Sequence, residues 1–101
     1  MESYIISDNE ETLIGMKMAG ISGEIMTDRE VIIKKIDELI LDPKVGIIIL
    51  THQIKMMIEE EVMKRKLQSR ETLIVEIPGP KENIKSDFIT KYIRESIGLK
   101  L

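Results

Sequence analysis

The sequence predicts an α/β fold, a single domain over residues 1–101 with a four-stranded parallel sheet and helices on both faces. Stretches typical of strands alternate with stretches of helical spacing in the order βαβαβαβα. One strand, "VGIIIL" at 45–50, is a continuous apolar run rich in β-branched residues, which is typical of a central parallel strand. With right-handed crossovers we expect the strand order 2-1-3-4 of receiver-like and flavodoxin-like domains.

The first strand and the start of the first helix follow from residues 3–11. "SYII" at 3–6 is a short apolar stretch. Ser7 followed by Glu10 makes a capping box, and Asp8 with Glu11 gives a second register of the same motif. The two registers predict a helix that begins within this turn.

Three glycines, Gly15, Gly20 and Gly23, lie within "ETLIGMKMAGISGEIM" at 11–26. They do not match G-x-G-x-x-G, and they come at the end of the helix rather than before one, where a phosphate would bind. Gly20 stands where a helix C-cap favours a positive φ. We therefore expect a helix that ends here and passes into a second strand at 23–26, not a nucleotide loop.

Apolar residues of the first helix fall on more than one face. Leu13, Met16, Ala19 and Gly20 share one face, which we expect to be the inner one. Ile14 and Met18 fall on another face. The core needs only one of these faces, so the other is available for a different contact.

The second helix begins at the capping box Thr27–Glu30 and ends before Asp42-Pro43. The third is expected over 52–67, with Thr51 as its cap. The inner faces predicted for these two helices comprise Ile32, Ile36, Leu39 and Ile40 in the second and Ile54, Met57, Ile58 and Val62 in the third.

A fourth strand at 72–77 ends at Pro78-Gly79-Pro80. The last helix is expected at about 86–98, with Ile89, Ile93 and Ile97 at i,i+4 spacing.

Composition excludes several classes of function. The net charge is −3 and no long basic run occurs, so we expect no nucleic-acid partner. Absence of cysteine excludes a disulfide framework, a thiolate zinc site and a cysteine nucleophile, and suits the cytoplasm. No apolar run approaches the roughly 20 residues of a membrane helix, so we expect no direct membrane insertion.

A phospho-receiver site fits the predicted fold but not its residues. That chemistry needs a carboxylate at the end of the third strand, and this strand ends in Thr51-His52. His52 is the only histidine, and with Asp8 it leaves a phosphocarrier or degenerate receiver as the alternative function. We expect no catalytic, cofactor-binding or metal-binding residues.

Methionine is frequent, at seven of 101 residues. Met56 and Met63 lie seven apart in the third predicted helix and off its inner face. Two interpretations remain open: loose filling of the core, or an adaptable docking surface for a partner helix.

Four stretches together resemble the F subunit of the archaeal-type and vacuolar-type (A/V-type) ATP synthases and ATPases. These stretches are "ISDNEETLIGMKMAGISGEI", "VGIIILTHQI", "TLIVEIPGP" and "DFITKYIRESIGLKL". They occur in the family's order and run nearly end to end. His52 departs from the acidic residue common at its position, and Met16-Lys17 stands where the family has an aromatic-basic pair.

The resemblance implies a non-catalytic subunit of the central stalk. Such a subunit binds the coiled-coil D subunit in the rotor and helps couple ATP hydrolysis or synthesis to H⁺ or Na⁺ transport. It is a cytoplasmic, peripheral part of a membrane-bound complex and has no cofactor. Its C-terminal helix, here about 86–98, can change position and touch the catalytic A/B head transiently.

Partner-binding residues are expected among the surplus apolar positions and in the C-terminal helix. The predicted set is Ile14, Met18, Met56, Met63, Phe88, Tyr92 and Ile97.

Overall fold

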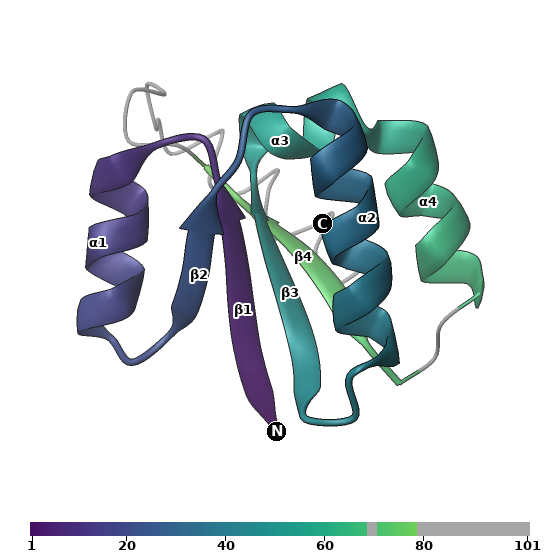
Figure 1. The fold of residues 1–101 in the computed structure, drawn as a ribbon, viewed down its shortest axis with the longest axis horizontal. Helices are drawn as coiled ribbons and strands as arrows, with labels where there is room; N and C mark the ends of the chain where they lie inside the picture. Colours follow the sequence, from purple (N-terminus) through teal and green to yellow (C-terminus); the bar gives the residue numbers. More distant parts are fainter. Residues whose placement is uncertain (69–70, 79–101) are drawn as a thin grey trace, which may run out of the picture.

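The structure is a computed structural model that describes residues 1–68 and 71–78 of the chain (Figure 1). The elements, in chain order, are β1 (Glu2–Ser7), α1 (Glu10–Met18), β2 (Ser22–Ile25), α2 (Arg29–Leu41), β3 (Val45–Thr51), α3 (His52–Met57), α4 (Glu59–Gln68) and β4 (Leu73–Ile77). The helix predicted at about 86–98 lies outside the described residues.

The four strands form one parallel sheet in the order β2-β1-β3-β4, which confirms the predicted fold class and topology. The apolar run predicted as a central strand is β3, which pairs with β1 on one side and β4 on the other. Because its neighbours cover both edges and layers of side chains cover it, almost every residue of β3 is buried.

The main core lies between the sheet and α2, α3 and α4. Alternate residues of the strands turn to this side, among them Ile6, Ile48 and Ile74. The helices contribute Ile32, Ile36 and Leu39 from α2, Ile54 and Ile58 from the α3 region, and Val62 from α4. The predicted inner face of α2 is therefore confirmed, with Ile40 partly buried at its end.

α1 lies on the opposite face of the sheet, against β1 and β2 (Figure 1). The packing there is close at Gly23 of β2, where an added Cβ would stand 2.2 Å from Cγ2 of Ile5 and 3.1 Å from Cδ1 of Leu13. A glycine is needed at this point because the side chain of Ile5 already fills the space. Leu13 and Met16 are half-buried, but Ala19 and Gly20, predicted on the inner face, are exposed.

The ends of α1 and α2 correct the predicted caps by one or two residues. Asn9, not Ser7 or Asp8, caps α1: its Oδ1 accepts from the Thr12 backbone N–H at 3.1 Å. Asp28, not Thr27, caps α2 through a bond from the Val31 N–H. Asn and Asp are at least as good caps as Ser and Thr, so several registers compete in such a turn.

Gly20 ends α1 as predicted, with φ +87°. The Gly20 N–H donates to the Lys17 carbonyl and the Ile21 N–H donates to the Met16 carbonyl, both at 2.9 Å. These two bonds form a Schellman motif, which satisfies carbonyls that the end of the helix leaves free.

The helix predicted over 52–67 is two helices, α3 and α4, which meet at Ile58. Ile54, Ile58 and Val62 are buried as predicted, whereas Met57 is 42% exposed. Thr51 precedes α3 without capping it by its side chain.

Candidate functional site

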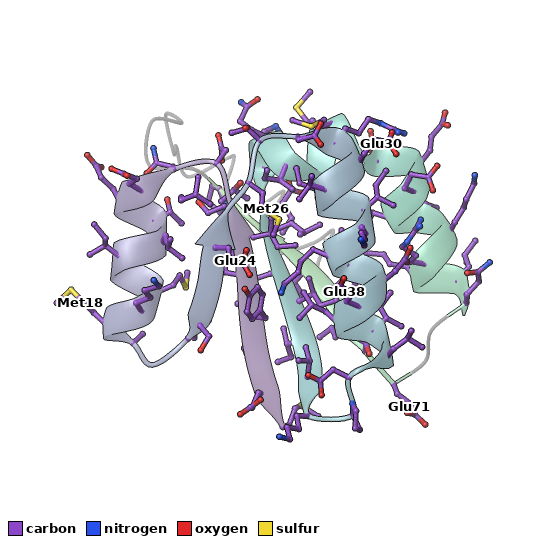
Figure 2. The ribbon with its side chains drawn as sticks, in the orientation of Figure 1. Met18, Glu24, Met26, Glu30, Glu38 and Glu71 are labelled. Atoms are coloured by element: carbon purple, nitrogen blue, oxygen red, sulfur yellow. The ribbon has the colours of Figure 1, made fainter. Side chains whose placement is uncertain are left out.

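α1 presents an apolar surface to solvent. None of its residues is buried, Ile14 is 57% exposed and Met18 is 85% exposed. Gly15 lies beside them, and a Cβ added there would meet nothing within 4 Å. We call Ile14, Gly15 and Met18 the α1 outer face; Figure 2 shows Met18 projecting away from the rest of the fold.

A second exposed apolar group lies on α3 and α4. Met56 is 59% and Met63 54% exposed, so neither fills the core of the chain. α3 and α4 pack on the other face of the sheet from α1 (Figure 1). The described members of the predicted set therefore form two surfaces rather than one. Phe88, Tyr92 and Ile97 lie outside the described residues.

The carboxyl ends of β1 and β3 meet at the edge where α/β sheets usually bind ligands. Here Thr51 Oγ1 donates to Asp8 Oδ1 at 2.6 Å. The Ser7 hydroxyl accepts from the Asn9 N–H and donates to the Asn9 carbonyl. The Thr51–Asp8 bond joins the end of β3 to the turn after β1, and the Ser7 bonds lie within that turn.

The two residues that raised the phosphotransfer alternative, Asp8 and His52, do not share a contact. His52 Nδ1 lies against Glu76 Oε2, and Lys55 Nζ lies 3.3 Å from Glu76 Oε1. Glu76 is a charged residue on the core side of β4, so these two basic side chains from α3 compensate its partial burial. The predicted candidate His52 thus serves in a contact that fastens α3 to β4.

The Glu76 contact is one of the features that sequence reasoning missed. A signal existed, because Glu76 interrupts the apolar run "TLIVEI" and a charge within a strand needs a partner. Which partner it takes depends on how α3 crosses β4, and one sequence does not define that.

A second polar cluster joins β1, β2 and α2. The Tyr4 hydroxyl donates to Glu24 Oε1, and Lys35 Nζ lies 3.1 Å from the same oxygen and over the Tyr4 ring. Burial, then the bond to Glu24, raises the pKa of Tyr4 well above its usual value. The bonds from Tyr4 and then Lys35 lower the pKa of Glu24.

A groove between α2 and α4 is spanned by an ion pair. Arg65 Nε and Nη2 donate to the Asp37 carboxylate at 2.6 and 3.1 Å, and Nη1 donates to Glu61 Oε1 at 2.8 Å. On α4 itself, Lys64 Nζ also lies 3.6 Å from Glu61 Oε2. Hydrogen bonds to Asp37, then Glu61, raise the pKa of Arg65, and the bond from Arg65 lowers the pKa of Glu61.

Within residues 1–68 and 71–78, no group of three or more His, Cys, Asp or Glu side chains could hold a metal ion. No helix in the same part of the chain is both long enough and apolar enough to cross a membrane.

Comparison with known proteins bears on what these surfaces serve. No curated protein matches the chain. One family model does match, the ATP synthase (F/14-kDa) subunit, over residues 4–95, which include all eight described elements except the first two residues of β1. The chain therefore belongs to the ATP synthase (F/14-kDa) subunit family and associates with the ATPase complex.

Proposed function

We propose that this chain is a non-catalytic subunit of the central stalk, the rotor of an A/V-type rotary ATPase. In this role it binds the coiled-coil D subunit and helps couple ATP hydrolysis or synthesis to H⁺ or Na⁺ transport. It is a cytoplasmic, peripheral part of a membrane-bound complex. Family membership supports a place in the complex, and the exposed face of α1 supports a helical partner.

The observation that carries the proposal is the α1 outer face. A surface helix ordinarily exposes polar residues, because polar groups form hydrogen bonds with water and apolar groups do not. α1 instead exposes Ile14 and Met18, one turn apart, with Gly15 between them. An apolar stripe beside a glycine lets the backbone of another helix approach closely, so a helix of the coiled coil fits here.

Charges at the ends of α1 give such a contact an orientation. Glu10 and Glu11 lie in the first turn and Lys17 in the last. A partner helix with basic residues beside the first turn and an acidic residue beside the last complements this pattern.

The surface with Met56 and Met63 faces the other way, so we assign it to a different partner from the one that α1 binds. The A/B head, touched transiently by the helix at about 86–98, is the other partner in the proposal. Methionine side chains suit a contact that forms and breaks, because they repack easily against different neighbours.

Co-purification with the D subunit tests the proposal. Wild-type chain is expected to form a one-to-one complex that survives high salt, because the contact is apolar. Met18→Asp is expected to abolish the complex. Leu41→Asp is the matched control: Leu41 is 83% exposed at the end of α2, away from α1. Failure of the wild type to bind the D subunit, or equal loss in both variants, contradicts the proposal.

A phosphocarrier or degenerate receiver is the second candidate function, and the contact of His52 with Glu76 is the observation that favours it. A carboxylate at Nδ1 leaves Nε2 as the nucleophilic nitrogen. Incubation with a small phosphodonor followed by intact-mass measurement decides this point. Our proposal requires no phosphate on His52 or Asp8.

A further inference from the structure

The outer side of α4 carries exposed apolar side chains next to charges of opposite sign. Val62 is 1% exposed and marks the side of the helix that packs on the core. Four residues at i, i+3, i+4 and i+7 share the opposite side of the helix: Glu60, Met63, Lys64 and Leu67. All four are exposed, Met63 by 54% and Leu67 by 77%. We call them the α4 outer stripe.

The charges of α4 are separated along its axis. Its first three residues are glutamates, and a basic run begins one turn later. Lys64 Nζ lies 3.6 Å from Glu61 Oε2, but the Lys64 side chain stays 65% exposed. Glu60 forms no ion pair with another residue of 1–68 or 71–78. The stripe therefore presents an unpaired carboxylate near one end and a solvated ammonium group one turn along the helix.

We propose that the α4 outer stripe binds the same stripe of a second copy of this chain, with the two helices antiparallel about a two-fold axis. Such an axis sets the acidic end of each helix beside the basic end of the other. When the axis passes near Val62, Glu60 of each copy lies opposite Lys64 of the other, because each stands two residues, about 3 Å, from the axis. Met63 then meets its counterpart across the axis, and Leu67 lies about one turn beyond each ion pair.

The order of charges favours a second copy over a different protein. A partner for this stripe needs basic residues opposite Glu60, acidic residues opposite Lys64 and apolar side chains between them. α4 itself has this pattern when it is turned end for end. A parallel pair of the same helices would instead set like charges against each other, which repels. The charges therefore specify the antiparallel arrangement, and the apolar side chains supply the attraction.

This contact is small, so the association it supports is weak and reversible. α4 extends ~15 Å, and one pair of such helices buries less than the roughly 1,200 Å² of a standard interface. We expect dimers to form at about 10 μM to 1 mM. Met63 also belongs to the surface assigned above to the A/B head, so a chain paired through α4 cannot make that contact at the same time. The dimer is accordingly a form of the unassembled chain.

Charge reversal in the full chain tests the proposal, with sedimentation equilibrium as the measurement. The wild type is expected to show a monomer–dimer equilibrium without larger species, because a two-fold contact closes on itself. Glu60→Lys and Lys64→Glu are each expected to raise Kd about tenfold or more, because the axis repeats each pair and one substitution turns two attractions into two repulsions. An equal mixture of the two variants is expected to associate again, because one stripe is then basic and the other acidic.

Glu10→Lys is the matched control, since it makes the same change of charge in the first turn of α1. α1 and α4 lie at opposite ends of the molecule (Figure 1), so this variant is expected to keep the wild-type Kd. Met63→Asp is expected to abolish the dimer, because it sets two carboxylates against each other at the axis. Circular dichroism checks that each variant is folded.

Three results overturn the proposal. The first is a wild-type chain that stays monomeric at about 1 mM. The second is a dimer that Glu10→Lys weakens as much as Glu60→Lys does. The third is a mixture of the two charge-reversal variants that fails to associate. Because the assay uses the chain without the D subunit, its outcome is independent of the proposed function.

Discussion

Gly15→Ala separates what stabilises this chain from what we propose it binds. Gly15 is the sixth residue of α1 and its φ is not positive, so alanine adopts the same backbone conformation. An added Cβ would meet nothing within 4 Å. The substitution therefore creates no steric conflict in the isolated chain.

The size of the change in the free energy of unfolding follows from helix propensity, since Gly15→Ala alters no contact within the chain. Alanine in a helix interior is favoured over glycine by about 0.8–1.0 kcal/mol, chiefly because the unfolded chain loses flexibility. For a domain of this size a gain of about 1 kcal/mol raises Tm by roughly 4–8 °C. The measurement is thermal and urea unfolding followed by circular dichroism.

Binding is expected to change in the opposite direction. If a partner helix lies across the α1 outer face, the new methyl group holds it away and lowers affinity for the D subunit by about tenfold, which is ~1.4 kcal/mol. Isothermal titration of the same preparation measures this. A variant with lower Tm refutes the reasoning about α1, and a more stable variant with unchanged affinity refutes Gly15 as the point of close approach.

Other substitutions have distinct expected outcomes. Gly20→Ala places a Cβ on a residue with φ +87° and should lower the free energy of unfolding, measured in urea, by about 1–2 kcal/mol. Gly23→Ala should lower it more, since the new Cβ would clash with the backbone carbonyl oxygen of Ile5. Asp37→Asn removes a bidentate partner of Arg65; because Asp37 is half exposed, the loss should be only about 1 kcal/mol and should shrink in high salt. The folded-state pKa of Glu24 is lowered, so its carboxylate contributes to the free energy of unfolding above the pKa of the unfolded chain, and this contribution is lost as pH falls through the folded-state pKa. Glu24→Gln should therefore destabilise the chain at neutral pH but not in acid, and urea unfolding at neutral and at acidic pH measures the difference.

Sheet topology was predictable because it depends on patterns that repeat along the chain. Strand and helix periods alternate, and only a strand covered on both faces tolerates a run like that of β3. The inner face of α2 followed for the same reason, since Ile32, Ile36 and Leu39 repeat at helical spacing. The strand order could be predicted from the alternation of strands and helices because right-handed crossovers leave few arrangements for a parallel sheet.

The break between α3 and α4 was not predictable in the same way. No glycine or proline lies near Ile58, and the residues around it favour a continuous helix. Ile54, Ile58 and Val62 are buried on both sides of the junction, so burial against the sheet is compatible with the interruption there. Helix propensity alone therefore does not account for the break between α3 and α4.

The candidate surfaces were predictable only residue by residue. Helical spacing separated Ile14 and Met18 from the inner face, and both are exposed. Spacing could not place α1 and α3 relative to each other, so Met18 and Met56 were grouped although they lie on opposite sides of the sheet. Their role in binding a partner stays a prediction.

The way in which α1 is held strengthens the case for a partner. A nine-residue helix with no buried side chain gains little from the core, and helices of this length are marginal by themselves. Its two ends are held by hydrogen bonds, the Asn9 side-chain cap at one end and the Schellman bonds around Gly20 at the other, while half-buried Leu13 and Met16 face the sheet. Neither device depends on the residues of the outer face. These devices do not require Ile14 or Met18 to be apolar, which is why we propose these two residues as a contact for another protein.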